Sequence, residues 1–145
     1  MIKDNRSKQQ INNWVLNRFN KLGRIISVEE LKNKYNVEDM ILSGTNLLKD
    51  YYSLLFAGKF NKKKYYVMEN NRLYCNGDIV IGDKPDSKCE VRHCFTTHSI
   101  QGETAHHNLF IDNSKMFDSR MFYTAISRAK TLEQIFIIEN KQIVC

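Results

Sequence analysis

The sequence predicts an α/β fold in which a mostly parallel sheet is covered by helices on both faces. Short apolar runs of strand length alternate with segments of helical periodicity, which is the pattern of such folds. Two polar segments that contain glycine, at 43–46 and 96–104, directly follow predicted strands. Ligands of α/β folds bind at the carboxyl ends of the strands, so these segments are candidate sites. A length of 145 residues suits one domain with a substantial core.

The N-terminal segment is basic and predicts a helix. Residues 1–24 carry a single acid, Asp4, against six cations: Lys3, Arg6, Lys8, Arg18, Lys21 and Arg24. Apolar residues at helical spacing predict a helix over 10–19, and they are Ile11, Trp14, Val15 and Phe19. We expect residues 1–26 to form a basic helix and connector, and residues 27–145 to form the main domain.

The next segment predicts two helices and a strand. Ser27 and Glu30 form a capping box, which predicts a short helix to about residue 35. Residues 40–43 are an apolar run before Gly44 and predict a buried strand. Thr45 then opens a helical pattern to residue 55, with an apolar stripe of Leu47, Leu48, Tyr51, Leu54 and Leu55. Strand, tight turn and helix together form a βα unit.

The remaining elements complete the predicted sheet. Residues 65–68 and 72–81 predict a small β-hairpin insertion, with a bulge or turn at Gly77-Asp78 in its second strand. Residues 84–87 predict a loop. Strands are expected at 91–96, 109–111 and 134–138, and a helix at 118–130.

The segment TTHSIQGET, residues 96–104, is rich in groups that suit phosphate oxygens. Thr96, Thr97 and Ser99 supply hydroxyls, and His98 supplies a ring donor. Gly102 allows the backbone to approach a ligand closely. The alternative is a capped turn after a strand, with a buried histidine.

The segment FYTAISRAK, residues 122–130, predicts a helix with one arginine among small and apolar neighbours. Its packed stripe consists of Phe122, Ala125, Ile126 and Ala129. Arg128 lies near the helix end, and its guanidinium has a fixed fork of donors suited to a phosphoryl group. The alternative is a surface arginine paired with a nearby acid.

These two blocks, in this order and spacing, resemble motifs V and VI of superfamily 1 helicases, in particular the RecD-like branch with a UvrD-like C-terminal domain, which moves 5′ to 3′ on DNA. Residues 41–46, ILSGTN, resemble motif IV, and Gly77-Asp78 is similar to an element that precedes motif V. The family often has a lysine where this chain has Ser99. The resemblance covers residues 38–140 and implies a C-terminal RecA-like domain of the P-loop-NTPase type.

The resemblance also implies roles for eight residues. Thr45, Asn46, Thr97 and His98 would contact single-stranded DNA. Gln101, Gly102 and Glu103 would couple that strand to the nucleotide. Arg128 would act as an arginine finger at the γ-phosphate, a role worth roughly 10³–10⁵ in rate.

The sequence lacks GxxxxGK[ST] and an Asp-Glu magnesium motif after a strand. An arginine finger without a P-loop cannot hydrolyse ATP, so the chain alone is expected to be inactive. The resemblance implies that ATP and Mg²⁺ are bound mainly by a separate N-terminal RecA-like domain, in cis or in trans. The alternative is a non-catalytic module, derived from half a helicase, that binds nucleic acid or a replication protein.

The composition of the chain limits the kinds of partner and the cellular compartment that we expect. A net charge of +6 is consistent with a polyanionic partner and also with ordinary solubility. We expect no membrane partner, because no run of eighteen apolar residues and no signal peptide occur. Four irregularly spaced cysteines indicate reduced thiols in the cytoplasm or nucleus. One proline and abundant Asn, Lys, Ile and Tyr are typical of an AT-rich genome, such as that of a large DNA virus.

Two further patterns have competing interpretations. A zinc site could be drawn from Cys89, His93, Cys94 and His98, but no spacing matches a common zinc module, so buried thiols are favoured and no metal site is expected. His106 and His107 are expected in a solvated loop. Aromatic side chains could stack on bases or belong to the core, and they are Trp14, Tyr51, Tyr52, Tyr65 and Tyr66.

Overall fold

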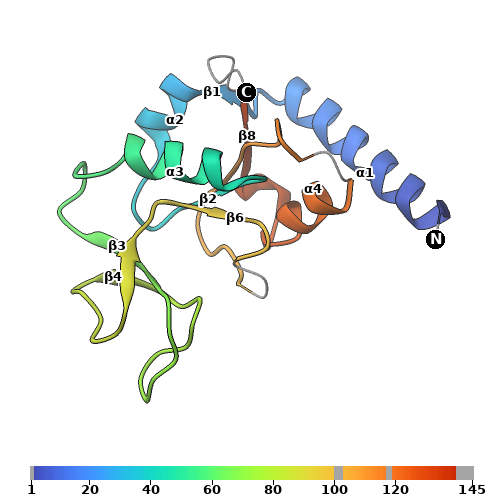
Figure 1. Ribbon diagram of the computed structural model, residues 1–145. Helices are drawn as coiled ribbons and strands as arrows, with labels where there is room; N and C mark the ends of the chain where they lie inside the picture. The colour runs from blue at the N-terminus through green and yellow to red at the C-terminus, as the bar shows by residue number, and fades with distance from the viewer. Residues whose placement is uncertain (1, 100–102, 117–118, 140–145) are drawn as a thin grey trace.

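A five-stranded parallel sheet forms the centre of the molecule (Figure 1). The computed structural model describes residues 2–99, 103–116 and 119–139, and of residues 2–9, 11 and 119 it describes the backbone alone. In spatial order the strands are β1 (Ile25–Ser27), β8 (Ile135–Glu139), β7 (Leu109–Ile111), β2 (Met40–Ser43) and β6 (Cys94–Thr96). Every neighbouring pair is parallel. The predicted fold class is therefore confirmed.

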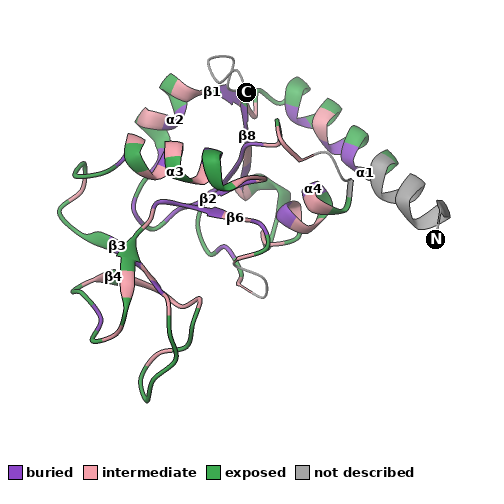
Figure 2. Ribbon diagram, in the orientation of Figure 1, coloured by how far each residue is buried: buried purple, intermediate pink, exposed green. Residues whose placement is uncertain are grey.

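Helices cover both faces of this sheet. On one face lie α1 (Ile2–Lys21) and α4 (Ser119–Ile126), and on the other lie α2 (Val28–Lys34) and α3 (Asn46–Leu55). Successive residues of β2 show why. Leu42 belongs to the core under α1 and α4, whereas Ile41 belongs to the core under α2 and α3. Side chains of a strand alternate between faces, so the apolar run of β2 fills two cores (Figure 2).

A second, antiparallel sheet is the predicted insertion. It consists of β4 (Ile79–Gly82), β3 (Lys63–Val67) and β5 (Cys89–Val91), in that order. The second strand of the hairpin begins later than predicted, because residues 68–78 form a loop with its own hydrogen bonds. Asp78 Oδ2 accepts from Cys75 N at 2.8 Å, and Gly77 has a φ of +100° that favours glycine. The Gly77-Asp78 turn therefore precedes the strand.

The predicted strand 91–96 is wrong in one respect: it is two strands in different sheets. The chain leaves the antiparallel sheet after Val91 and enters the parallel sheet at Cys94. At the crossing, Arg92 N donates to Lys64 O at 2.9 Å and His93 N donates to Ser53 Oγ at 3.3 Å. These two bonds fix the change of sheet.

The predicted helix 118–130 is too long at its C-terminal end. It ends at Ile126, and Arg128 lies in the turn that follows. A short bridge between Ala105 and Ala129 explains the early end, since Ala105 N donates to Arg128 O at 2.8 Å. This bond draws the chain away from the helix axis. The 3₁₀ helix η1 (Leu132–Gln134) then leads into β8.

The N-terminal region differs from expectation in length and in its exposed residues. The first helix begins at Ile2 and not at residue 10, and the predicted boundary after residue 26 falls within β1, a strand that was not predicted. Val15 and Phe19 enter the core, as their spacing indicated. Trp14 does not: it is 56% exposed, with the Arg18 guanidinium 5.6 Å from its ring.

The apolar stripe of α3 is also shifted from the prediction. Leu48 and Tyr52 are its buried residues, whereas Leu47 and Leu54 are exposed. The predicted capping of α2 is confirmed in one direction, since Ser27 Oγ accepts from Glu30 N at 3.2 Å.

Candidate functional site

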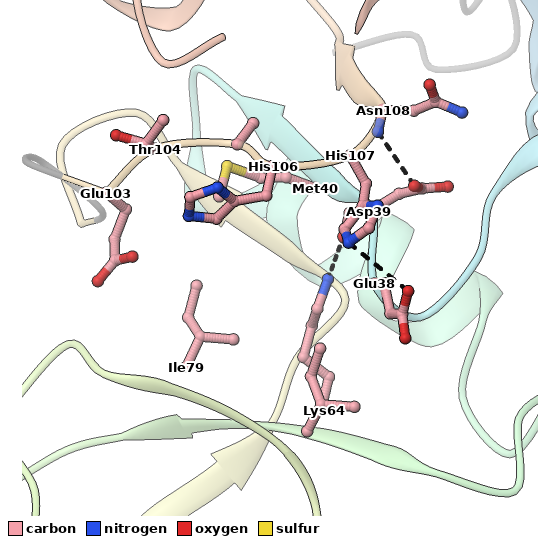
Figure 3. Close-up of a pocket in the computed structure, with 12 residues that line it drawn as sticks. Glu38, Asp39, Met40, Lys64, Ile79, Glu103, Thr104, His106, His107 and Asn108 are labelled. Atoms are coloured by element: carbon pink, nitrogen blue, oxygen red, sulfur yellow. Dashed lines mark hydrogen bonds and ion pairs between the residues drawn. The ribbon is translucent and has the colours of Figure 1, made fainter. Parts of the chain in front are cut away.

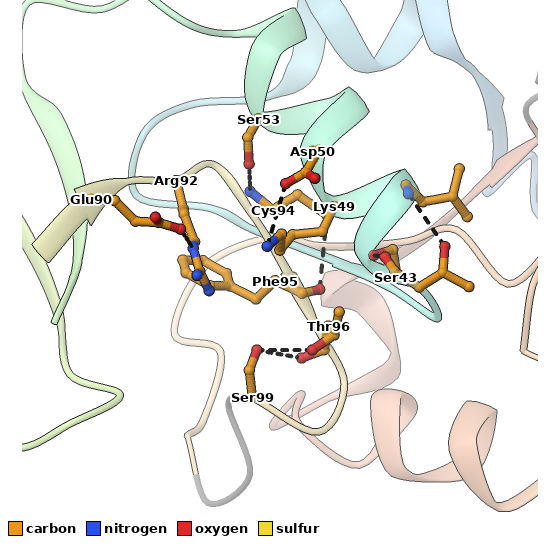
Figure 4. Close-up of polar contacts among 12 residues, drawn as sticks. Ser43, Lys49, Asp50, Ser53, Glu90, Arg92, Cys94, Phe95, Thr96 and Ser99 are labelled. Carbon is orange, nitrogen blue, oxygen red and sulfur yellow. Dashed lines mark hydrogen bonds and ion pairs between the residues drawn. The ribbon is translucent and has the colours of Figure 1, made fainter. Parts of the chain in front are cut away.

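The carboxyl ends of three neighbouring strands, β7, β2 and β6, lie together at one edge of the sheet. The segment that resembles motif IV and the first part of the one that resembles motif V lie there, and Figure 4 shows Ser43, Thr96 and Ser99 among them. Backbone bonds hold these segments together after the strands end. Thr97 N donates to Ser43 O at 3.1 Å, and Asp112 N donates to Leu42 O at 2.9 Å. The two segments that resemble motifs IV and V are therefore adjacent.

The N-terminus of α3 opens at this edge. Thr45 is its N-cap, and Thr45 Oγ1 accepts from Leu48 N at 3.3 Å. Asn46 follows as the first helical residue, with an exposed side chain. The uncapped amides of the first turn and the helix dipole favour an anion here. Gly44 is required by close packing, since a Cβ would lie 2.7 Å from the carbonyl oxygen of Lys115.

The turn at residues 96–99 closes on itself. Ser99 N and Ser99 Oγ both donate to Thr96 O, at 3.1 and 3.0 Å, and Thr96 Oγ1 donates to Ser99 Oγ at 3.1 Å. Thr97 is 2% exposed and its hydroxyl donates to Ser43 O at 3.4 Å. His98, in contrast, is exposed. Of the four residues predicted to contact DNA, Asn46 and His98 present their side chains to solvent, while the Thr45 and Thr97 hydroxyls are engaged within the fold.

A buried carboxylate that the sequence analysis missed supports this edge. Asp112, at the end of β7, is fully buried. Its Oδ2 accepts from the Tyr52 hydroxyl at 2.5 Å, and its Oδ1 accepts from Ser114 N and Oγ at 2.9 and 2.6 Å. Charge-assisted bonds of this kind compensate the burial of a carboxylate. The only signal in the sequence was an acid directly after an apolar strand.

The opposite, amino edge of the sheet carries Arg128 and Glu103. Arg128 Nε donates to Thr124 O at 3.3 Å, and Nη1 and Nη2 lie 3.5 Å from Glu103 O and Ser127 Oγ. Within the part of the chain that the structure describes, Arg128 forms no ion pair. Among the described residues the guanidinium therefore has long contacts only. Gln101 and Gly102 lie outside the described residues.

Gln134 holds the segments on either side of Arg128 together. Its amide nitrogen donates to Ala105 O at 2.9 Å and to His107 O at 2.7 Å. Its amide oxygen accepts from Lys130 N at 2.7 Å and from Thr131 N at 2.9 Å. The sequence analysis did not identify this residue, although the Thr131-x-x-Gln134 spacing is that of a capping box.

A pocket of about 360 Å³ opens beside Glu103, between residues 103–108 and the antiparallel sheet (Figure 3). Its floor is apolar and includes Met40 and Ile79. Its rim includes a contact in which His107 Nε2 lies 3.6 Å from Glu38 Oε2. The predicted solvated loop at His106 and His107 is confirmed, since both are exposed.

A buried lysine forms the inner wall of this pocket. Lys64 is 3% exposed, and its ammonium donates to the Tyr35 hydroxyl at 3.2 Å and to the carbonyl oxygen of Asp39. Burial lowers the pKa of Lys64 to about 8, although the Asp39 carboxylate acts against that shift. Burial likewise raises the pKa of Asp39, whose carboxylate accepts from Asn36 N and Asn108 N.

Two of the four candidate zinc ligands, His93 and Cys94, are buried in the fold. His93 Nδ1 lies 3.0 Å from the Tyr35 hydroxyl, and burial, followed by the nearby Lys64 charge, lowers the pKa of His93 to about 4. Cys94 is fully buried, which raises its pKa to about 12. Among the described residues, no group of three or more His, Cys, Asp or Glu side chains is placed to hold a metal ion.

Most of the candidate stacking aromatics belong to the core or pack against it. Tyr52 and Tyr65 are buried, and Tyr51 and Tyr66 are partly buried, which leaves Trp14 as the exposed member of the set. None of the described helices is long and apolar enough to cross a membrane.

Comparison with known proteins supports the fold. No family model and no curated protein matches the sequence. Among solved structures, the fold is similar to a chain from a study of DNA unwinding at forked double-stranded DNA by two coordinating Pif1 helicases, with a TM-score of 0.51 and 15% sequence identity. The match covers 75% of this chain and 41% of that chain, so this protein spans less than half of that helicase chain. The similarity confirms the predicted RecA-like fold.

Proposed function

We propose that this chain is the C-terminal RecA-like motor domain of a superfamily 1 DNA helicase, of the RecD-like type with a UvrD-like C-terminal domain. It binds single-stranded DNA at the carboxyl edge of its sheet and supplies Arg128 to ATP. Three motif resemblances and the fold shared with a Pif1 helicase chain support this proposal.

The observation that carries the proposal is the state of Arg128. Its guanidinium has contacts of 3.3 Å or longer and no carboxylate partner among the described residues. An unpaired arginine fork suits the charge that develops on a transferring phosphoryl group. Glu103 lies beside it, at the end of the segment that would couple DNA to the nucleotide through Gln101 and Gly102.

At the carboxyl edge, we assign direct DNA contacts to Asn46 and His98. Both side chains are exposed beside the N-terminus of α3, where backbone amides favour a phosphate. Thr45 and Thr97 act at the same surface by holding the helix cap and the 96–99 turn in place.

ATP and Mg²⁺ would be held mainly by an N-terminal RecA-like domain, in cis or in trans, because this sequence has no P-loop. Arg128 would stabilise charge on the γ-phosphate at the domain interface, and Glu103 would line the nucleotide side of this domain. Cycles of ATP binding and hydrolysis would open and close that interface and move the domain along the strand. We place this activity in the cytoplasm or nucleus, and the composition suits a large DNA virus.

A titration of the isolated chain with a labelled oligo(dT) tests the DNA surface. We expect binding that weakens steeply with salt, since each phosphate contact releases counterions. The double substitution Asn46→Ala/His98→Ala should weaken binding by roughly tenfold, which corresponds to about 1.4 kcal/mol. The matched control Asn17→Ala/His106→Ala changes exposed residues of the same types elsewhere. An equal loss in both variants would refute the assignment.

The alternative function is a non-catalytic module derived from half a helicase. Such a module could show the same salt-sensitive DNA binding. It would not raise ATP hydrolysis when an N-terminal ATP-binding domain is supplied, whereas a motor domain would. Salt-insensitive behaviour would instead indicate a protein partner.

A further inference from the structure

Five lysines come from three segments that meet at the C-terminal end of α2, and we call them the lysine ridge. The ridge consists of Lys32 and Lys34 in α2, Lys59 and Lys62 after α3, and Lys63 at the start of β3. Lys59 Nζ donates to Lys32 O at 2.8 Å, which joins the segment after α3 to α2. Figure 1 shows α2 above α3, with this segment beyond the end of α3 on the same side of the parallel sheet.

Carboxylates neutralise little of this ridge. Glu29 pairs with Lys32 at 3.2 Å, but Lys34, Lys59, Lys62 and Lys63 form no ion pair among the described residues. The sequence contains no acid in residues 31–37 or 51–68. The cation surface extends further at Phe136, where the Lys34 ammonium and the Arg24 guanidinium lie 5.4 and 4.8 Å from the ring.

Folding does not account for all of these charges. The dipole of α2 favours cations in its last turn, which explains Lys32 and Lys34. Lys59 has its bond to Lys32 O, but neither explanation applies to Lys62 and Lys63, which are exposed and outside any helix. Gathering like charges raises the local positive potential, and that potential attracts a polyanion.

The chemistry of the ridge favours a phosphate backbone over a protein surface. Lysine is a compact, strongly hydrated point charge and is depleted from the interfaces between proteins. The exposed aromatic side chains among the described residues, Trp14 and Tyr123, lie in other segments, and the exposed apolar neighbour of the ridge, Leu54, has no ring for stacking on unpaired bases. Phosphate contacts without stacking suit a duplex, in which the bases are already paired.

The ridge is separate from the single-strand surface proposed above. Lys32 and Lys34 lie in the last turn of α2, and Lys59 follows the C-terminal end of α3. Asn46 lies at the opposite end of α3, whose ten residues span about 15 Å. We propose that the lysine ridge binds the phosphate backbone of a nucleic-acid duplex, independently of the single-strand site. Together the two surfaces would hold a junction between duplex and single strand; that joint role rests on the proposed function, whereas duplex binding does not.

The test compares two triple variants of the full chain with the same change in net charge. Lys59→Gln/Lys62→Gln/Lys63→Gln removes the three exposed ridge lysines outside α2, and Lys21→Gln/Lys84→Gln/Lys88→Gln removes exposed lysines elsewhere. A labelled blunt DNA duplex of about 20 base pairs is the probe, titrated over a range of salt. Far-UV circular dichroism checks that both variants fold.

We expect the ridge variant to bind the duplex at least roughly tenfold more weakly at low salt, and the slope of log K against log salt to fall by about 3, from three lost phosphate contacts. The control variant should change duplex affinity by less than about twofold, and the ridge variant should bind oligo(dT) normally. Equal losses in both variants would show a general charge effect and overturn the proposal, as would unchanged duplex binding. Loss of oligo(dT) binding in the Asn46→Ala/His98→Ala variant bears on the single-strand site alone.

Discussion

The two edges of the parallel sheet use their polar residues in opposite ways. At the carboxyl edge, the hydroxyls of Thr45, Thr97 and Ser99 are all engaged by nearby backbone or side-chain groups, at 3.0 to 3.4 Å. At the amino edge, the Arg128 guanidinium has contacts of 3.3 to 3.5 Å and no carboxylate partner among the described residues. The polar side chains of one edge are used within the fold, whereas the guanidinium at the other edge has only long contacts.

This difference predicts how substitutions at the two edges should behave. A change at the carboxyl edge should reduce the free energy of unfolding first and binding second. A change at Arg128 should reduce activity with little loss of stability. The following predictions test that contrast.

Arg128→Ala should have the largest effect. In a complete motor, with the ATP-binding domain supplied, we expect the hydrolysis rate to fall roughly 10³–10⁵-fold, or about 4–7 kcal/mol in the barrier. Arg128→Lys should rescue little, because an ammonium lacks the planar fork. The melting temperature should stay near that of the parent, and the exposed neighbour Lys130→Ala should keep its turnover. Retained turnover in Arg128→Ala would refute the finger assignment.

Lys64→Met should change how stability depends on pH. The folded-state pKa of Lys64 is about 8 against an ordinary value of 10.5, so between these values the unfolded chain binds more protons. This group therefore adds stability as pH rises from 8 to 10.5, and its full penalty is present below pH 8. The free energy of unfolding of the parent should therefore rise by about 3 kcal/mol relative to that of Lys64→Met across that window.

Urea unfolding of both proteins between pH 8 and 10.5 measures this difference. Lys63→Met is the matched control, because Lys63 is the exposed neighbour of Lys64 in the same strand. Its free energy of unfolding should change with pH in the same way as that of the parent. If the free energy of unfolding of Lys64→Met also follows the parent across this range, the Lys64 ammonium is hydrated in solution and is not buried.

Gly44→Ala should destabilise the carboxyl edge. The added Cβ would lie 2.7 Å from the Lys115 carbonyl oxygen and 3.1 Å from Met116 Cγ. Overpacking of this kind costs about 1–3 kcal/mol, which thermal or urea unfolding would detect. An unchanged unfolding midpoint would mean that the Lys115 backbone moves aside without cost.

Thr97→Val should have the smallest effect. It keeps the shape of a side chain that is 2% exposed and removes a hydroxyl whose bond to Ser43 O is long, at 3.4 Å. We expect a loss of about 0.5–1.5 kcal/mol in the free energy of unfolding, with oligo(dT) affinity within about twofold of the parent. A roughly tenfold loss of affinity at unchanged stability would mean that the Thr97 hydroxyl binds a DNA phosphate directly. The two edges would then not differ in the way described above.

The elements that the sequence predicted best are those whose burial is determined locally. Residues 40–43 and 109–111 are short apolar runs because both faces of their strands are covered. β1 was missed because it has three residues and pairs with β8, which lies more than a hundred residues away in the chain. A strand defined by such a distant partner leaves little trace in its own sequence.

Other errors came from sequence patterns that are compatible with more than one local structure. The run from Val91 to Thr96 contains no turn signal, so the sequence does not indicate that the chain changes sheets at Arg92 and His93. Trp14 has the spacing of a core residue, but α4 covers only the neighbouring side of α1, where Val15 and Phe19 lie. Helical periodicity gives a face, and the packing partner decides how wide that face is.

The candidate site was partly predictable for the same reason. The residue types in 96–104 and 122–130 indicate phosphate chemistry because that chemistry depends on local donors. Which donors remain available depends on distant partners, such as Ser43 for Thr97. Gln134 was missed because two of its four bonds, to Ala105 O and His107 O, reach positions that only the folded chain brings near.

The crossing between the two sheets also has a mechanical consequence. Arg92 and His93 are the whole connection between β5 and β6, and a link of two residues extends by no more than about 7 Å. Beyond that link, β6 leads directly into the turn at residues 96–99, and the Tyr66 hydroxyl of β3 donates to Ser99 O at 3.2 Å. A displacement of the antiparallel sheet is therefore transmitted to this turn in two ways, through the short covalent link and through the Tyr66–Ser99 hydrogen bond.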